Sequence, residues 1–223
     1  MLEVWRGGSR YRGGDPAAGV ATRHAFSFSG SYDPDNVRFG LLVACNEEQL
    51  APGAGFDLHP HRDLEIVTWV VSGELEHRDS EGHTARVRPG DLQRLGAGAG
   101  IRHIERNPGD EPLRFVQMWL VPGTFGGEPV YEVVRGIADA TPFAIPGTDA
   151  VLHVRRLGEA EVTAVPDAAW VYVHVVRGTV RVDAHRLSAG DAARITGADG
   201  LAATAERDTE LLVWEMHAEP VYG

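Results

Sequence analysis

The feature that most constrains the fold is an internal repeat of short apolar segments. Residues 70–120 and 175–216 share one order: a strand, a glycine turn and a strand, then "RPGD" or "SAGD", and later a closing apolar strand. The segments are rich in Val, Leu, Ile and aromatic residues, and the chain's glycines (27) and prolines (13) separate them. Such spacing is typical of antiparallel sandwiches and barrels. The repeat therefore predicts an all-β chain of two tandem antiparallel β-barrels with a jelly-roll-like plan.

The stretch "PGTFGGEPVYEVVRG" follows Leu120 and contains the expected link between the barrels. We expect an N-terminal barrel over residues 1–125 and a C-terminal barrel over residues 126–223. A chain of 223 residues is long enough to bury a substantial core.

Composition narrows the classes of ligand and location. The net charge of −11 disfavours a direct nucleic-acid ligand, because an acidic chain repels phosphates. No basic tract marks a membrane surface, and no apolar run approaches the roughly 18 residues that a membrane span needs. The N-terminus lacks the apolar region of a signal peptide. The one cysteine, Cys45, excludes an intrachain disulfide and is expected to be a buried apolar residue, so we expect a cytoplasmic protein.

The two copies of the repeat differ in their polar residues. Alignment of their glycines pairs His59 with Ala164, His61 with Pro166, His103 with Ala203 and Glu105 with Ala205. Residues that served only the fold should be tolerated in both copies. The asymmetry therefore predicts that these side chains serve chemistry in the first barrel.

The spacing of these residues is that of a metal site on strands. Alternation along a strand places His59 and His61 on one face, and likewise His103 and Glu105. Three imidazoles and a carboxylate suit a divalent first-row metal such as Fe(II), Mn, Ni, Cu or Zn, and leave positions open on a metal that prefers five or six ligands. The alternative is that the first pair lies exposed at a strand edge and that His103 is a hydrogen-bonded core residue.

The first histidine pair lies in a G-x5-H-x-H-x3-E pattern from Gly53 to Glu65, which resembles the first motif of the cupins. Residues 90–107 contain a looser form of the second motif. In detail, "HPHRDLEIVTWVVSGELEHRDS" and "GDLQRLGAGAGIRHIERN" are similar to pirins of the bacterial two-cupin (bicupin) type. The resemblance covers nearly the whole chain and is most specific over residues 24–120.

The resemblance implies a ligand set of His59, His61, His103 and Glu105, and Fe(II) as the usual metal. Glu65 matches the glutamate that binds the metal in many other cupins. In a pirin-like site it would instead lie behind the ligands and orient an imidazole. The alternative for Glu65 is a salt bridge with a neighbouring arginine.

The resemblance also implies a function, because several bacterial pirins show quercetin 2,3-dioxygenase activity. The first hypothesis is therefore a flavonol dioxygenase, whose substrates are a small aromatic molecule and dioxygen and whose catalytic carboxylates are Glu105 or Glu65. The second is a non-catalytic metal sensor or regulator that acts through a protein partner, as the eukaryotic relatives do. A sugar isomerase or another cupin enzyme stays open, because cupins host many chemistries. A deep cavity would favour an enzyme.

Four further residues are expected at the pocket: His24, Phe115, Gln117 and Trp119. The last three alternate along one strand and would line an aromatic-walled cavity with one amide. The alternatives are core packing for Phe115 and Trp119, and a strand-end hydrogen bond for His24. The other histidines are expected mostly on the surface or in barrel walls: His77, His83, His153, His174, His185 and His217.

Overall fold

The computed structural model describes residues 1–220, and the chain forms two compact units. Within the described residues, unit 1 comprises Met1–Arg10, Phe39–Leu41 and residues 138–220, and unit 2 comprises Tyr11–Arg38 and Leu42–Ile137. Each unit contains two antiparallel sheets, so the expected all-β architecture of two barrels is confirmed. The only helical segments in the described residues are the short 3-10 turns η1 (Gly7–Ser9) and η2 (Pro16–Ala18). None of the helices in this part of the chain has the length and apolarity to cross a membrane.

Unit 2 is the first barrel. Its seven-stranded sheet has the order β12 (Val130–Val134), β9 (Leu92–Gly96), β6 (Glu65–Ser72), β11 (Leu113–Leu120), β4 (Leu42–Leu50), β3 (Val20–His24) and β2 (Tyr11–Gly13). Its four-stranded sheet has the order β5 (Gly55–His61), β10 (Ile101–Arg106), β7 (Leu75–Asp79) and β8 (Thr84–Val87). Both sheets contribute to one buried apolar cluster, so they pack face to face. That cluster contains Val20, Leu50, Val70, Leu75, Val87, Leu113 and Phe115.

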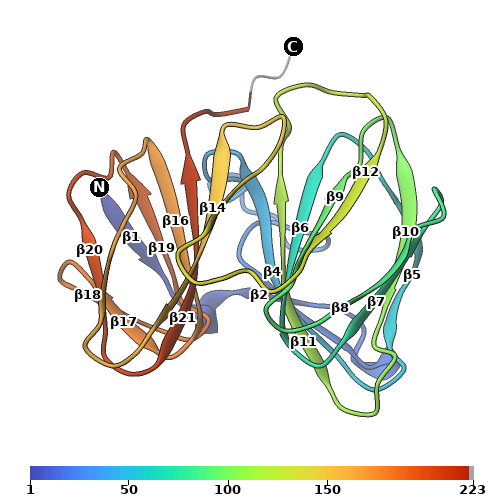
Figure 1. Cartoon of the computed structure of the whole chain (residues 1–223), viewed down its shortest axis with the longest axis horizontal. Coiled ribbons are helices and arrows are strands. Elements are labelled where there is room, and N and C mark those ends of the chain that lie inside the picture. The colour runs from blue at the N-terminus through green and yellow to red at the C-terminus, as the bar shows by residue number, and fades with distance from the viewer. Residues whose placement is uncertain (221–223) are drawn as a thin grey trace. The chain divides into compact units, whose positions relative to one another are not determined.

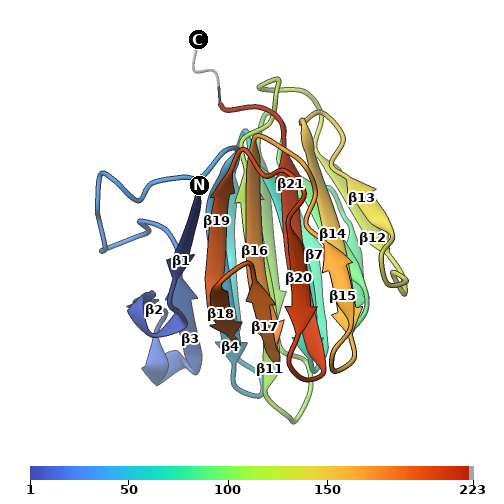
Figure 2. The same cartoon turned by 90° about the vertical axis from the view of Figure 1, so that its left-hand side faces the viewer.

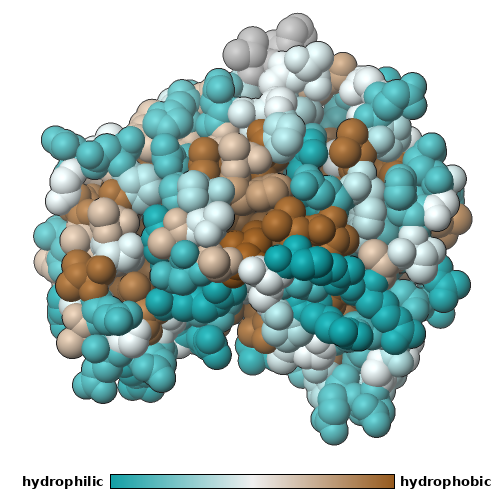
Figure 3. All heavy atoms as spheres, in the orientation of Figure 1, coloured by the Kyte–Doolittle hydropathy of each residue, from teal (hydrophilic) through white to brown (hydrophobic). Residues whose placement is uncertain are grey.

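Unit 1 is the second barrel and repeats this plan (Figure 2). Its six-stranded sheet has the order β1 (Leu2–Trp5), β19 (Ala192–Thr196), β16 (Trp170–Arg177), β21 (Thr209–Met216), β14 (Ala150–Leu157) and β13 (Pro142–Ala144). Its four-stranded sheet has the order β15 (Val162–Ala164), β20 (Ala202–Ala205), β17 (Thr179–Val182) and β18 (His185–Ser188). The interior of this barrel is filled by Val, Ala, Leu and Ile side chains. On the face of the molecule in Figure 3, hydrophilic side chains are spread over both units.

Each barrel has one edge strand that comes from the part of the sequence expected to form the other barrel (Figure 1). β1 begins the chain but pairs with β19 of the second barrel, with Leu2 opposite Ile195. β12 begins after residue 125 but pairs with β9 of the first barrel, with Val134 opposite Leu92. A division between residues 125 and 126 therefore leaves β12 outside the barrel to which it pairs.

An aspartate in the "SAGD" turn anchors the exchanged strand of the second barrel. The Asp191 carboxylate accepts hydrogen bonds from the backbone nitrogens of Gly7 (2.8 Å) and Ser188 (3.0 Å). It also pairs with the Arg6 guanidinium at 2.7 Å. Burial would raise the pKa of Asp191, but these hydrogen bonds outweigh it and lower the pKa.

The "RPGD" turn does the same in the first barrel. The Asp91 carboxylate accepts from the Gly136 nitrogen (3.0 Å) and pairs with Arg135 at 2.6 Å, directly after β12. The Arg-Gly pairs that follow β1 and β12 are thus held by equivalent aspartates, which explains why both copies of the repeat retain "GD".

Strand register corrects one part of the repeat alignment. His59 lies opposite His103 in the first barrel, and Thr163 lies opposite Ala203 in the second. His59 therefore corresponds to Thr163, and the expected match with Ala164 was wrong by one residue; His61 likewise corresponds to Val165 and not to Pro166. The second copy has one more residue before the next strand, because Trp69 and His174 occupy the same register. The chemical contrast between the copies persists.

We expect Asp191→Ala to lower the free energy of unfolding by about 2 kcal/mol, because it removes three hydrogen bonds, two from Arg6 and Gly7 after β1 and one from Ser188. Denaturant unfolding followed by tryptophan fluorescence measures this change. The matched control is Asp208→Ala, which alters an exposed aspartate of the same unit. Equal stability of the two variants would contradict the anchoring role.

Candidate metal centre

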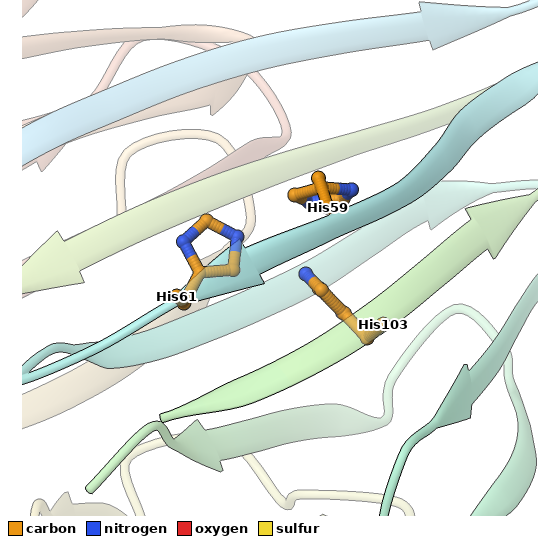
Figure 4. Close-up of side chains that lie close together, drawn as sticks. All are labelled: His59, His61 and His103. Carbon is orange, nitrogen blue, oxygen red and sulfur yellow. The ribbon is translucent and has the colours of Figure 1, made fainter. Parts of the chain in front are cut away.

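Two adjacent strands of the first barrel bring three of the expected ligands together. His59 and His61 project from β5, and His103 projects from the neighbouring β10 toward the same space (Figure 4). The ring centroids are 4.9 Å apart for His59 and His61, 4.4 Å for His59 and His103, and 5.0 Å for His61 and His103. One ring nitrogen of each lies within 4.8 Å of the others. Side-chain alternation and antiparallel pairing are sufficient to produce this convergence.

Glu105 lies beside this group, at a break in strand register. His103 pairs with His59, but Glu105 pairs with Phe56, so β5 has one extra residue between these two pairs. The ligand atoms of Glu105, His103 and His77 form a second group within 4.8 Å. The Glu105 side chain is fully enclosed by the barrel.

The histidine nitrogens are suited to a metal. In residues 1–220 the Nε2 atoms of His61 and His103 are buried and have no hydrogen-bond partner. Nδ1 of His59 donates to the Asp57 carbonyl oxygen at 2.7 Å, which leaves the lone pair on Nε2. Buried polar atoms without partners are costly in a folded protein. These three side chains therefore fit a divalent transition metal, which would satisfy the free nitrogens.

A chain of hydrogen bonds behind His103 fixes which of its nitrogens is free. Burial would raise the pKa of Asp79, but hydrogen bonds from His77 and His83 outweigh it and lower the pKa, so Asp79 is ionised. An ionised carboxylate only accepts, so His77 donates from Nε2 to Asp79 (3.1 Å), and the neutral form of His77 presents a lone pair at Nδ1. His103 then donates from Nδ1 to that atom (3.4 Å). The His103 Nε2 lone pair is left for a metal.

Burial also keeps the imidazoles of His61 and His103 neutral. Desolvation is the main cause that lowers the pKa of His61 to about 4, and the charges of His103 and His59 add to it. Desolvation likewise lowers the pKa of His103 to about 4, against the opposing effect of Glu105. A metal ligand must be unprotonated, so both side chains are ready to bind at neutral pH.

Two glutamines satisfy the buried Glu105 carboxylate. Gln93 donates from Nε2 to Oε1 at 3.0 Å, and Gln117 donates from Nε2 to Oε2 at 2.8 Å. Burial would raise the pKa of Glu105, but His103 and His77, together with these two hydrogen bonds, lower it. Glu105 is therefore an ionised carboxylate in the barrel interior.

The orientation of each glutamine is itself fixed. Trp119 Nε1, which can only donate, bonds to Oε1 of Gln117 at 3.0 Å. The Tyr131 hydroxyl donates to Oε1 of Gln93 at 3.0 Å. Both amides must therefore direct their NH₂ groups at Glu105, which rigidly positions the carboxylate.

These residues belong to a polar row that crosses the barrel wall. Register places Gln93 opposite Thr68, Thr68 opposite Gln117, Gln117 opposite Asn46, and Asn46 opposite His24. At the positions of Gln93, Thr68 and Gln117 the second barrel has only apolar residues. These are Ala193, Val173 and Val213. Ala203 and Ala205 likewise replace His103 and Glu105. The polar interior is therefore specific to the first barrel.

A cavity of about 560 Å³ opens onto the histidines. Its lining includes three of the expected ligands and three of the expected pocket residues: His59, His61, Glu105, His24, Gln117 and Trp119. Phe28 of the loop after β3 stacks on His24 (4.6 Å between centroids) and meets Trp119 edge-on (5.1 Å). The cavity thus has an aromatic wall beside its polar one.

Two expected residues lie elsewhere. Phe115 lies one row deeper than Gln117, in the apolar cluster with Val70 and Leu113, as the core-packing alternative has it. Glu65 does not line the large cavity and pairs with Arg94 at 2.8 Å, which is the salt-bridge alternative.

Sequence reasoning missed three residues that shape the site. His77 and Gln93 are on strands distant in sequence from the histidine motif, and only barrel closure brings them to it. Glu48 lines the cavity from β4. Its only signal was alternation, which places Asn46 and Glu48 on one face of "ACNEEQL".

We expect the metal-free protein to lose stability as the pH falls from about 6.5 toward 4. Over this range the unfolded histidines bind protons while folded His61 and His103 resist them, so protons favour the unfolded state. Acid titration followed by tryptophan fluorescence locates the transition. His61→Leu should move it down by roughly half a pH unit, and the exposed His217→Leu should not. Identical midpoints in all three proteins would exclude this origin.

Comparisons with known proteins agree with the fold and the site. The family model described as pirin matches residues 8–120, and a model of the quercetinase C-terminal cupin domain matches residues 147–216. A Mycobacterium tuberculosis protein named "Putative quercetin 2,3-dioxygenase" is 41% identical over 90% of this chain and 89% of its own. The quercetin 2,3-dioxygenase of Escherichia coli is 33% identical over 86% of this chain and 90% of its own.

Among solved structures, the bacterial pirin YhhW of Escherichia coli in complex with nickel(II) superimposes with a TM-score of 0.90 and 30% identity, over 99% of this chain and 100% of that chain. Sequence and fold thus agree over nearly the full length of both proteins. The chain belongs to the pirin family of bicupin proteins.

Proposed function

We propose that this protein is a metal-dependent dioxygenase that acts on a flavonol such as quercetin. The proposed metal ligands are His59, His61, His103 and Glu105. The observation that carries the proposal is the set of unpartnered imidazole nitrogens beside a large, partly aromatic cavity. The names of the relatives supply the reaction and the substrate class.

The proposed metal is Fe(II), and Mn, Ni, Cu and Zn suit the same donors. When bound, it would supply Lewis acidity toward a substrate oxygen. The nickel(II) in the YhhW complex supports a divalent ion in such a site. Three imidazoles and one carboxylate would hold the ion with a net protein charge of −1, since an imidazole binds a metal in its unprotonated form.

The protein groups around the cavity have distinct roles in this proposal. Trp119 and Phe28 present faces and edges against which a flat aromatic ring packs. Glu105 is ionised and rigidly held, so it can accept the proton of a substrate hydroxyl. Glu65 receives no catalytic role, because its carboxylate is engaged by Arg94.

The cavity also favours an enzyme over a non-catalytic sensor. A volume of about 560 Å³ lies within the range of small-molecule sites. A regulator that acts through a protein partner has no need of such a space. The cytoplasm suits the single buried thiol, Cys45, and we keep that location as part of the proposal.

We expect His61→Ala to lose the bound metal and to lower quercetin turnover by at least about 100-fold, because it removes a ligand. Metal content is measured by elemental analysis, and turnover by flavonol absorbance together with dioxygen uptake. The matched control is His217→Ala, which alters a histidine of the second barrel. Full metal content and turnover in His61→Ala would refute the ligand assignment. A fully loaded wild type without turnover would refute the dioxygenase.

A further inference from the structure

The cavity has a second polar wall that the proposed ligand set does not use. Thr22 of β3 and Glu48 of β4 lie opposite each other in register, and Asn46 lies two residues from Glu48 on the same face. All three residues line the cavity. None of them is near the metal-ligand strands β5 and β10 in the sheet order.

The hydrogen bonds on this wall use one polar atom of Glu48 and one of Asn46. The Thr22 hydroxyl donates to Oε2 of Glu48 at 2.5 Å. Nδ1 of His24 donates to Oδ1 of Asn46 at 3.0 Å. The other polar atoms of these side chains, Oε1 of Glu48 and Nδ2 of Asn46, belong to residues that line the cavity. Both side chains are more than nine-tenths buried, and they face the cavity.

A purely structural role does not account for this arrangement. Burial of the Glu48 carboxyl group costs free energy, and an apolar pair at the positions of Thr22 and Glu48 would avoid that cost. Two positions further along the same strands the residues are apolar, and Val20, Leu50 and Leu113 pack together. The polar side chains of Thr22, Asn46 and Glu48 are therefore positioned to bind a molecule in the cavity.

The wall is suited to hydroxyl groups and not to ions. Burial raises the pKa of Glu48 to about 8 against the effect of the Thr22 hydrogen bond, and the charge of Glu105 raises it further. A protonated carboxyl group both donates and accepts a hydrogen bond. With the Asn46 amide it presents neutral donors and an acceptor, which complement a phenol without requiring a charged substrate.

We propose that Glu48, held by Thr22, and Asn46 form a subsite for a ring hydroxyl of the aromatic substrate, distinct from the hydroxyl directed at the metal site. The proposal rests on the proposed function for the class of substrate. It assigns the preference for hydroxylated rings to β3 and β4. It predicts that a flavonol without further hydroxyls gains nothing from this wall.

The test measures binding in the absence of dioxygen, so that it does not depend on turnover. Nickel(II)-loaded protein is titrated with quercetin and with 3-hydroxyflavone, which shares the metal-directed hydroxyl and ketone but has no other hydroxyl. We expect Glu48→Leu to weaken quercetin binding about tenfold and to change 3-hydroxyflavone binding by less than about twofold. Glu48→Gln, which keeps a neutral donor and acceptor, should retain most of the preference.

The matched control is Glu47→Leu, on the opposite face of the same strand. If Glu48→Leu fails to fold, Thr22→Val provides a second route, because it frees Glu48 while keeping the carboxyl group. We expect it to weaken quercetin binding about threefold and to spare 3-hydroxyflavone.

Each outcome decides a part of the proposal. Equal loss for both flavonols in Glu48→Leu, or no loss, overturns the subsite. A Glu48→Gln protein as weak as Glu48→Leu overturns the neutral-acid recognition. Tight quercetin binding with the expected variant pattern but no aerobic turnover in iron-loaded protein supports the subsite and refutes the dioxygenase. No binding of either compound to the wild type overturns the substrate class and the subsite with it.

Discussion

The structure of the first barrel depends on the burial of one ionised carboxylate, Glu105. A lone charge in an apolar interior would be strongly disfavoured. Here Gln93 and Gln117 each donate to one carboxylate oxygen, and Tyr131 and Trp119 fix the orientation of the two amides. This requirement explains why a row of polar residues crosses a sheet that otherwise builds a core. It also ties the metal centre to the barrel wall, because Gln117 and Trp119 line the same cavity as His59 and His61.

The second barrel shows what the same plan becomes without that carboxylate. The positions of Gln93, Gln117 and Glu105 carry Ala193, Val213 and Ala205, and the interior closes into one apolar cluster. The aspartate of the turn and the Arg-Gly pair that it anchors are retained in both. The interactions that stabilise the fold are therefore shared by the two copies, and the polar residues of the site are confined to the first. An internal repeat of this kind separates structural from chemical residues within a single sequence.

Particular residues show how far the sequence could predict the site. His59, His61 and His103 followed from strand alternation and from their absence in the second copy, and the structure brings them together. The place of Phe115 depended on its depth in the barrel, and that of Glu65 on its cross-strand neighbour Arg94. Strand alternation predicts neither. His77 is a single residue on a distant strand that no local pattern marks, and Glu48 is marked only by the alternation of its strand. The one-residue error in the histidine alignment has the same origin, because an extra loop residue is invisible when turns are matched by glycine alone.

The sequence by itself determined the class of the fold, the family and the face of β5 on which two imidazoles lie. These follow from periodicity and from the repeat, which are properties of neighbouring residues. Only the tertiary structure decided which nitrogen of His103 is free, and that the pKa of Glu105 is lowered while that of Glu48 is raised. Those states depend on burial and on partners that are distant in sequence: Gln93 and Gln117 lie 12 residues from Glu105, and Thr22 lies 26 residues from Glu48. Protonation in a protein interior is set by the surroundings in space, so it is decided when the barrel closes.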